Sequence, residues 1–176
     1  FFFFLMLLIS ILALVGCADK ESISEEADTS KSQTTESEQT ATDYPIVIKH
    51  AFGETVIEEK PERVATVAWA NHDVALALGV VPVGFSAANY GVQDESGMLP
   101  WTAEKLKELG EENPNIFQDT DGLDFEAIAD SNPDVILAAY SGITQEEYDT
   151  LSQIAPVVAY PEIPWVITWR DQILYN

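Results

Sequence analysis

The sequence predicts an α/β protein with a mainly parallel sheet, preceded by a β-hairpin. From residue 63 onward, short runs of Val, Ile and Ala alternate with segments whose apolar residues recur at helical spacing. Helix caps, Gly and Pro separate these segments. Because a connection between parallel strands needs a crossover that is usually a helix, regular alternation of the two patterns is typical of a parallel sheet.

Order is expected to begin at Tyr44 with a β-hairpin. The runs at 46–48 and 55–57 are rich in β-branched residues, which favour strands. Gly53-Glu54 lies between them and is predicted to form the turn. His50 falls within this hairpin, where we expect it at the surface or at an edge.

Further strands are expected from short apolar runs. The run at 134–139 is almost wholly apolar, which is typical of a strand buried on both faces. Pro82 is expected near an edge or at a strand start, because proline cannot donate a hydrogen bond to a neighbouring strand. The predicted strands span 63–68, 80–85, 115–117, 134–139 and 156–160.

Each predicted helix begins at a residue whose side chain can accept a hydrogen bond from the first turn. The expected N-caps are Asn71, Thr102, Asp124 and Thr144, the last forming a capping box with Glu147. Gly79 and Gly110 are expected to close the first two helices, because glycine readily adopts the left-handed conformation that ends a helix. Pro133 follows the third helix, and the fourth is predicted to run through Ile154.

An apolar run at the N-terminus predicts an export signal. Apart from Ser10, residues 1–16 are apolar or Gly, and the run is shorter than the roughly 20 residues that cross a bilayer. We therefore interpret it as a signal peptide, incomplete because the chain begins at Phe1. Cys17, the single cysteine, follows directly. A buried core cysteine and a plain transmembrane anchor are the alternatives for this segment.

The segment that follows predicts a disordered tether. Residues 17–43 are rich in Ser, Thr and Glu and poor in aromatics, so they cannot bury enough apolar surface to fold. The whole chain carries 30 acidic and 8 basic residues, a formal charge of −22. That balance argues against a nucleic-acid partner and against electrostatic attachment to anionic lipid, since both rely on Lys and Arg.

The residues that follow the predicted strands indicate a ligand site. In parallel sheets, ligands bind outside the carboxyl ends of the strands. All four tryptophans lie in or just beyond these loops. Aromatic rings offer a bulky ligand rigid apolar area with a polar handle, and an arginine can pair with an anionic oxygen. The predicted ligand-binding residues are Trp69, Asn71, Tyr90, Trp101, Tyr140, Trp165, Trp169 and Arg170. The alternative is that the aromatic residues only cover their own core.

The sequence shows no arrangement typical of catalysis or metal binding. No serine lies in a Gly-x-Ser-x-Gly motif, and glycine-rich phosphate loops are absent. His50 and His72 lack the spacing of a zinc site. His72 could donate to a ligand or face solvent. We expect no enzymatic activity, no cofactor and no directly bound metal.

Taken in order, these features resemble the iron-siderophore substrate-binding lipoproteins of ABC importers. Leu14-Val15-Gly16-Cys17 is similar to the lipobox of bacterial lipoproteins. The motifs that carry the rest of the resemblance are Pro61-Glu62-Arg63-Val64, Glu126 with Asn132-Pro133-Asp134-Val135-Ile136, and Thr168-Trp169-Arg170. The resemblance covers the chain from Tyr44 to its C-terminus.

The resemblance implies a two-lobed fold with the ligand between the lobes. Residues 44–164 would form the N-terminal α/β lobe and 165–176 the start of the interlobe helix, with the C-terminal lobe missing. It also implies a lipid on Cys17, a location at the extracytoplasmic face of the cell membrane, and capture of a ferric siderophore for an ABC permease. Glu126 would contact that permease; the alternative is that its carboxylate only stabilises a helix N-terminus. Iron would be carried only inside the chelate.

One position departs from part of the family. Some catecholate-binding relatives have an arginine where this chain has Tyr140-Ser141-Gly142, so the resemblance favours neutral hydroxamate or mixed chelates over a tris-catecholate. A haem or cobalamin receptor on the same fold is the first alternative. A surface-anchored α/β hydrolase and an adhesive surface protein are the others.

Overall fold

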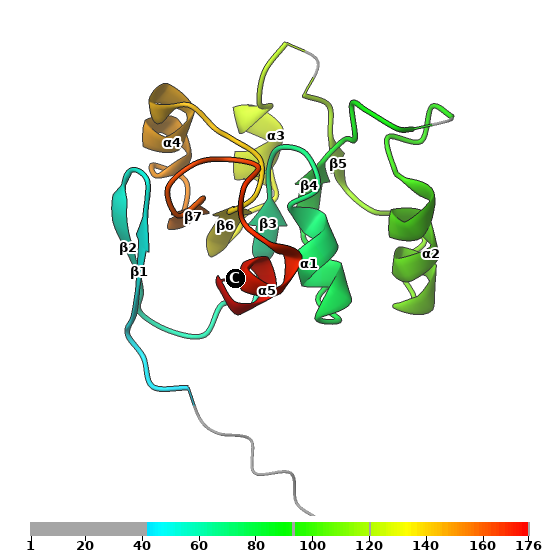
Figure 1. Ribbon diagram of the computed structural model, residues 1–176. Helices are drawn as coiled ribbons and strands as arrows, with labels where there is room; N and C mark the ends of the chain where they lie inside the picture. Colours follow the sequence, from blue (N-terminus) through cyan, green and yellow to red (C-terminus); the bar gives the residue numbers. More distant parts are fainter. Residues whose placement is uncertain (1–41, 93, 120, 176) are drawn as a thin grey trace, which may run out of the picture. The chain divides into compact units, whose positions relative to one another are not determined.

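The computed structural model describes residues 42–92, 94–119 and 121–175. These residues form a five-stranded parallel sheet, a two-stranded antiparallel hairpin and five helices (Figure 1). The predicted α/β class, the mainly parallel sheet and the preceding hairpin are therefore confirmed. The predicted signal peptide (1–16), Cys17 and the tether up to residue 41 lie outside the described residues. Within the described ranges, no helix is both long and apolar enough to cross a membrane.

The parallel sheet is built outward from a central strand. Its strands are β3 (Val64–Thr66), β4 (Gly84–Ser86), β5 (Ile116–Phe117), β6 (Val135–Ala138) and β7 (Val157–Ala159), in the spatial order β5-β4-β3-β6-β7. Ala65 of β3 lies opposite Gly84 on one side and Ile136 on the other. The chain therefore leaves β3 in one direction for β4 and β5, and then crosses to β6 on the other side. The carboxyl ends of β3 and β6 form the switch point at which open α/β sheets bind ligands.

The hairpin turns earlier than predicted. It consists of β1 (Ile46–His50) and β2 (Gly53–Ile57), with His50 paired to Gly53. Gly53-Glu54 is therefore not the turn; Ala51 and Phe52 form it instead. The reason is tertiary packing, since the Phe52 ring stacks on Tyr148 at a centroid distance of 4.9 Å. The N–H of Ala51 also donates to Tyr160 O at 2.9 Å, which fixes the turn against the end of β7.

The surface position expected for His50 is wrong, because its side chain is only 7% exposed. Its Nε2 lies 2.9 Å from the hydroxyl of Thr55, and that hydroxyl donates its proton to Val157 O at 2.7 Å. Nε2 of His50 must therefore be the donor to Thr55. Nδ1 then accepts from the N–H of Phe52 at 3.2 Å, so the ring is neutral. Burial lowers the pKa of His50, which is consistent with this neutral form.

Three of the four predicted N-cap positions are confirmed, and the one at Thr102 is wrong. The helices are α1 (His72–Ala77), α2 (Pro100–Glu108), α3 (Phe125–Asp130), α4 (Gln145–Leu151) and α5 (Trp169–Tyr175). Asp124 accepts from the N–H of Ala127 at 3.0 Å, and the capping box of Thr144 is present. Thr102 instead lies inside α2, whose N-cap is Leu99 with proline at the first helical position. Asn71 occupies the N-cap position of α1, but its side chain makes no capping hydrogen bond.

Several element boundaries also differ from expectation. Helix α4 ends at Leu151, before Ile154. The helix predicted from residue 165 begins at Trp169, where the N–H of Asp171 donates to the hydroxyl of Thr168 at 3.2 Å. Strand β4 begins at Gly84 and not at residue 80. The N–H of Val80 closes α1 by donating to Ala75 O at 2.8 Å, so Val80 does not belong to the strand.

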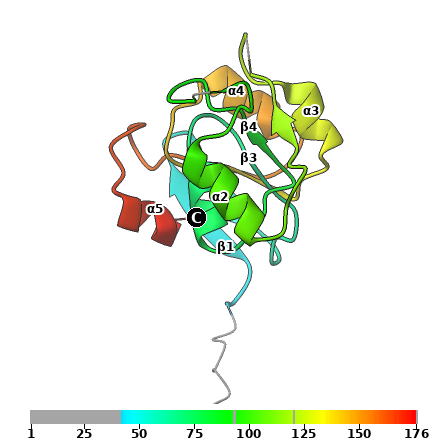
Figure 2. The ribbon, with the colours of Figure 1, turned by 90° about the vertical axis from the view of Figure 1, so that its right-hand side faces the viewer.

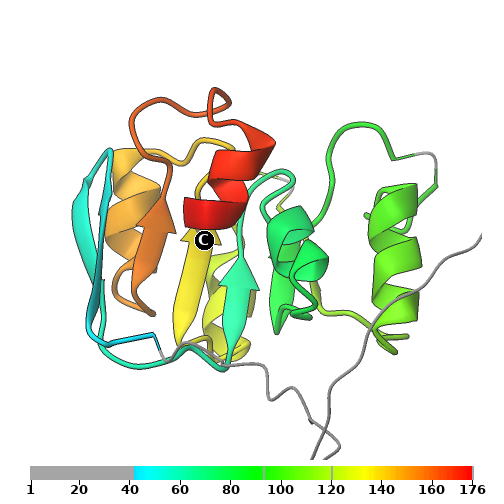
Figure 3. The same ribbon diagram turned by 60° about the horizontal axis from the view of Figure 1, so that its bottom comes forward.

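Apolar side chains of the sheet pack against elements on both faces. Alternation along β6 sends Ile136 and Ala138 into one cluster with Ile128 of α3 and Leu151 of α4. Val135 and Leu137 enter another cluster with residues of the hairpin and Tyr175 of α5. Figure 3 shows the hairpin beside β7 and α5 in front of the sheet. Figure 2 shows α2 in front of β3 and β4. Leu76 of α1, Phe85 of β4 and Leu106 of α2 pack together there.

The end of α5 is tied to the hairpin. The hydroxyl of Tyr175 donates to Lys49 O, and burial raises the pKa of Tyr175 to about 12. The hydroxyl therefore keeps its proton and its donor role. This bond and the apolar contacts of Tyr175 hold the C-terminal end of α5 against the hairpin and the sheet.

Two of the short motifs behind the resemblance, at 61–64 and 132–136, are joined by hydrogen bonds. The carboxylate of Asp134 accepts from the N–H groups of Glu62 at 2.8 Å and Arg63 at 3.0 Å, and the Asp134 N–H donates to Arg63 O at 2.9 Å. The Arg63 guanidinium donates to the carbonyls of Ser131 and Asn132, both at 2.6 Å, at the end of α3. These bonds align the amino ends of β3 and β6, opposite the edge that carries the loops.

Candidate functional site

The loops after the parallel strands converge on one hollow. It has a volume of about 440 Å³ and lies at the carboxyl edge of the sheet. Residues from the loops after β3, β4, β5, β6 and β7 line it, including Trp69, Asn89, Asp119, Ser141, Ile143 and Trp165. Parallel strands end at the same edge, so residues far apart in sequence meet there, as the sequence pattern predicts.

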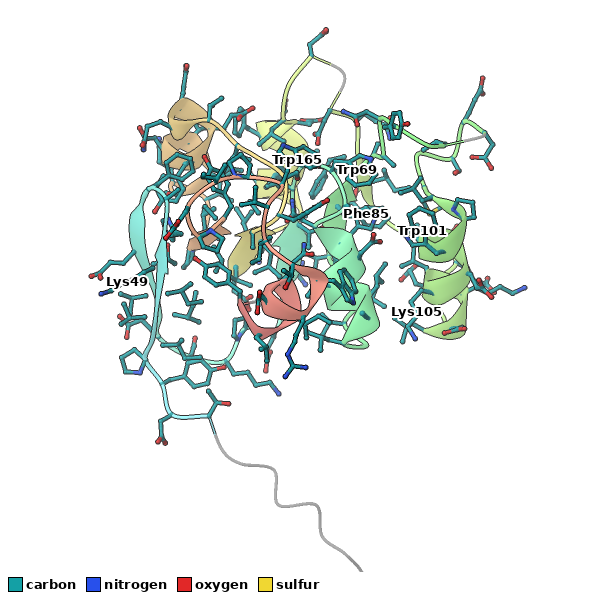
Figure 4. All side chains as sticks on the ribbon, in the orientation of Figure 1. Lys49, Trp69, Phe85, Trp101, Lys105 and Trp165 are labelled. Atoms are coloured by element: carbon teal, nitrogen blue, oxygen red, sulfur yellow. The ribbon has the colours of Figure 1, made fainter. Side chains whose placement is uncertain are left out.

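Three aromatic side chains form a wall beside this hollow. We call Trp69, Tyr140 and Trp165 the aromatic wall. Ring centroids lie 6.1 Å apart for the two tryptophans, 6.4 Å for Trp69 and Tyr140, and 5.3 Å for Tyr140 and Trp165. Figure 4 shows Trp69 and Trp165 close together at the loop edge. Trp165 is 54% exposed, so the wall offers apolar area that the core does not use.

The backbone around the aromatic wall is strained. Ala68, Ala70 and Trp165 have φ values of 60°, 64° and 71°, in the left-handed region that disfavours a side chain. Such residues persist where surrounding contacts over-determine them, and they cluster at binding sites. One of these contacts is the N–H of Ala68, which donates to the Ser86 hydroxyl at 2.8 Å. Another is the N–H of Trp165, which donates to Tyr140 O at 2.9 Å.

Asn71 lies buried behind the aromatic wall, whereas Tyr90 lies exposed beside it. The side chain of Asn71 is buried and hydrogen-bonded to Val67, Tyr140 and Ser141. Tyr90 is 79% exposed, and its carbonyl accepts from Nε1 of Trp69 at 3.3 Å. Tyr90 therefore lies at the rim, next to the wall. A direct ligand contact by either residue stays a prediction.

Trp101 lines a second hollow, separate from the first. This hollow has a volume of about 410 Å³ and is bounded by residues of α1 and α2 and by Trp169. Nε1 of Trp101 donates to the Asp73 carboxylate, at 3.1 Å to its nearer oxygen. Trp169 also lines a smaller hollow of about 230 Å³ together with Trp69 and Tyr140. Trp169 thus lies between the two sites, whereas Trp101 does not contact the aromatic wall.

Arg170 lines none of these three hollows and is exposed on α5. Successive residues of a helix point about 100° apart, so Trp169 and Arg170 face different directions. Glu126 is exposed in the first turn of α3. The roles predicted for Arg170 and Glu126 stay predictions.

The hollow beside the aromatic wall is acidic. The residues of the described chain that line it include Asp119 and Glu147 but no Lys, Arg or His. Burial raises the pKa of Asp119, opposed by hydrogen bonds from Ser86 and the N–H of Asp124. Asp119 is not among the residues predicted from the sequence, although its place two residues after the predicted strand 115–117 marks it as a candidate.

Both histidines are buried. His72 is 1% exposed, so it neither faces solvent nor reaches a ligand; its Nε2 lies 3.2 Å from the Thr102 hydroxyl. Burial lowers the pKa of His72, with partial opposition from the Asp73 carboxylate. The Ser141 hydroxyl accepts from Asn71, and among the described residues no hydrogen bond joins Ser141 to His72. In the part of the chain that the structure describes, no group of three His, Cys, Asp or Glu residues could hold a metal ion.

Known proteins are similar to this chain in sequence and fold. Residues 64–175 match the family described as "Periplasmic binding protein". The probable siderophore-binding lipoprotein YfiY of Bacillus subtilis (strain 168) is 30% identical, over 94% of this chain and 44% of its own length. PiaA of Streptococcus pneumoniae TIGR4, solved in complex with ferrichrome, is 66% identical with a TM-score of 0.70, over 74% of this chain and 43% of that chain. Staphylococcus aureus SirA complexed with staphyloferrin B is 32% identical with a TM-score of 0.55, over 72% of this chain and 39% of that chain.

These similarities bear out the resemblance read from the motifs. The chain spans less than half the length of the relatives named here. YfiY is named a siderophore-binding lipoprotein, PiaA and SirA were solved with ferrichrome and staphyloferrin B, and nothing among them supports the hydrolase alternative. Because the family match covers more than half of the chain, including the whole parallel sheet, the chain belongs to the periplasmic binding protein family.

Proposed function

We propose that this chain forms the N-terminal lobe of an extracytoplasmic lipoprotein that captures a ferric siderophore and delivers it to an ABC import permease. The observation that carries the proposal is the aromatic wall beside an open hollow at the carboxyl edge of the sheet. Relatives named for siderophore binding and crystallised with ferric chelates support it.

The chemistry of the wall suits such a ligand. A siderophore encloses its iron in an organic shell, so the protein recognises a bulky and partly apolar surface. Small-molecule sites of about 300–1,000 Å³ are typically lined by apolar and aromatic side chains with a few polar groups. The hollow of about 440 Å³ lies at the lower end of that range, as expected if a second lobe completes the site. Capture needs no cofactor, no resident metal and no bond-making step.

The charge of the hollow narrows the ligand class. Asp119 and Glu147 line it without a basic residue among the described lining residues. A tris-catecholate complex of Fe³⁺ is strongly anionic, so these carboxylates would repel it, whereas a neutral tris-hydroxamate meets no such penalty. The ferrichrome complex of PiaA agrees with this preference.

Anchoring and delivery complete the proposal. Cys17 would carry the lipid and residues 18–43 would hold the lobe away from the membrane. Each buried methylene contributes about 0.8 kcal/mol and one chain binds only reversibly, so at least two acyl chains are expected. Glu126, exposed on α3, would contact the permease.

The test is tryptophan fluorescence of the complete, delipidated gene product. It is titrated with ferrichrome, a ferric tris-catecholate, iron-free ferrichrome, haem and cobalamin. We expect saturable quenching by ferrichrome alone, weakened by Trp69→Ala and by Trp165→Ala. Trp101→Ala tests the second hollow: weaker quenching by ferrichrome would place this hollow in the binding site, and unchanged quenching would exclude it. Quenching by haem or cobalamin would favour the alternative receptor, and flat titrations across the panel would refute ligand capture.

A further inference from the structure

The aromatic wall needs support from outside its own loops. Ala68 and Ala70, on either side of Trp69, and Trp165 itself all adopt left-handed backbone conformations. Non-glycine residues hold such conformations only where other contacts impose them. Without those contacts the loops would relax and the three rings would no longer share one face.

Asn71 supplies contacts to two of these loops at once. Its side chain is 2% exposed. Nδ2 donates to Val67 O at 2.7 Å, which closes the loop that carries Trp69. Oδ1 accepts from the N–H of Tyr140 at 2.8 Å, which holds the loop after β6. The carbonyl of Tyr140 in turn accepts from the N–H of Trp165, so all three aromatic residues are connected through this one amide.

Ser141 accepts the remaining amide hydrogen of Asn71. Nδ2 of Asn71 donates its second hydrogen to the Ser141 hydroxyl at 2.7 Å, and Ser141 is 1% exposed. Both amide hydrogens are therefore directed at protein atoms, and Oδ1 faces the Tyr140 N–H. The backbone partners also define which end of the amide is oxygen and which is nitrogen. Asn71 thus has no donor left for a molecule in the hollow.

We propose that Asn71, supported by Ser141, is a positioning residue for ligand capture: it assembles the aromatic wall before the ligand arrives and does not contact the ligand. This role replaces the ligand contact that the sequence predicted for Asn71. A preassembled wall binds more tightly, because the loops are ordered during folding and not during binding. The link to ligand capture rests on the proposed function, but the assembly of the wall can be measured without a ligand.

Asn71→Asp tests this role in the complete gene product. The substitution keeps the shape of the side chain but places a carboxylate oxygen against Val67 O. At pH 7.5 we expect a reduced near-UV circular dichroism signal from the wall and about tenfold weaker ferrichrome binding, which corresponds to roughly 1.4 kcal/mol. Both are expected to recover at pH 5.5, because a buried carboxyl group protonates readily and can then donate to Val67 O. We expect the unsubstituted protein to show no such gain in signal or affinity between pH 7.5 and pH 5.5.

Two further variants complete the design. Ser141→Ala removes one of the three bonds and is expected to weaken binding about threefold, in proportion to a modest hydrogen bond. Asn115→Ala is the control for losing an asparagine-to-carbonyl bond away from the hollow, because the exposed Asn115 donates to Val83 O at 3.2 Å and does not line the hollow. It is expected to leave the near-UV signal and the ferrichrome affinity unchanged.

Each outcome decides the proposal. A folded Asn71→Asp protein with unchanged near-UV signal and affinity overturns it. Weaker binding without a change in the near-UV signal, and without recovery at pH 5.5, also overturns it, since Asn71 would then contact the ligand directly. If Asn71→Asp does not fold, Ser141→Ala decides, and an unchanged signal and affinity in that variant overturn the proposal. If the unsubstituted protein binds no ferric chelate but the near-UV signals behave as expected, ligand capture fails while the positioning role holds.

Discussion

Replacing Asp134 by alanine tests whether the shared family motif is structural. The Asp134 carboxylate accepts from the N–H groups of Glu62 and Arg63 at 2.8 and 3.0 Å. Because Asp134 is exposed, water partly replaces these bonds in the variant, and each contributes about 1 kcal/mol to stability. We therefore expect Asp134→Ala to lower the free energy of unfolding by about 2 kcal/mol. For a folded region of this size that is a fall in Tm of about 6 °C.

Thermal unfolding followed by far-UV circular dichroism measures this loss. Asp130→Ala is the matched control, since Asp130 is an exposed carboxylate at the end of α3. Ferrichrome affinity should not change in either variant, because Asp134 lies at the amino end of β6 and the hollow lies at the carboxyl edge. An Asp134→Ala protein as stable as the Asp130→Ala protein, or one that binds ligand more weakly, would refute this reasoning.

Three further predictions concern stability. The free energy of unfolding should fall as the pH drops from 7.5 to 5.5. Burial lowers the pKa of His50 in the folded protein, so the unfolded chain takes up the proton first, near the ordinary pKa of 6.5. His50→Gln should reduce this dependence of stability on pH in urea titrations, and an unchanged dependence contradicts the prediction. Gly84→Ala should cost about 3 kcal/mol, since its Cβ would lie 2.2 Å from Cζ of the buried Phe117; an unshifted urea midpoint would show that β5 can move. Thr144→Ala removes the acceptor for the Glu147 N–H and should cost about 1 kcal/mol in thermal unfolding, with Thr144→Ser as the variant that keeps the cap.

Local patterns predicted the elements whose partners lie nearby in the chain. Asp124 and Thr144 cap their helices as expected, because each accepts from an N–H three residues further on. Asn71 and Thr102 have the same capping chemistry but serve distant partners, namely Tyr140 and His72. Nothing within a few residues of either position distinguishes the two cases.

The hairpin shows the same limit. Its two strands follow from β-branched runs, but the turn and the burial of His50 depend on Tyr148, Tyr160 and Val157. These residues belong to or adjoin α4 and β7, which lie far along the chain from the hairpin. Side-chain burial is a property of that contact and not of the local sequence.

The sequence by itself determined the class of the fold and the edge of the sheet where a ligand would bind. Alternating strand and helix patterns require parallel strands, and parallel strands bring every following loop to one edge. Only the tertiary structure decided which of the aromatic candidates share a surface. It joined Trp69, Tyr140 and Trp165 in one wall and left Trp101 in a separate hollow. The physical reason is that strand order and loop conformation, including the strained residues around Trp69, result from long-range hydrogen bonds and packing that no short segment encodes.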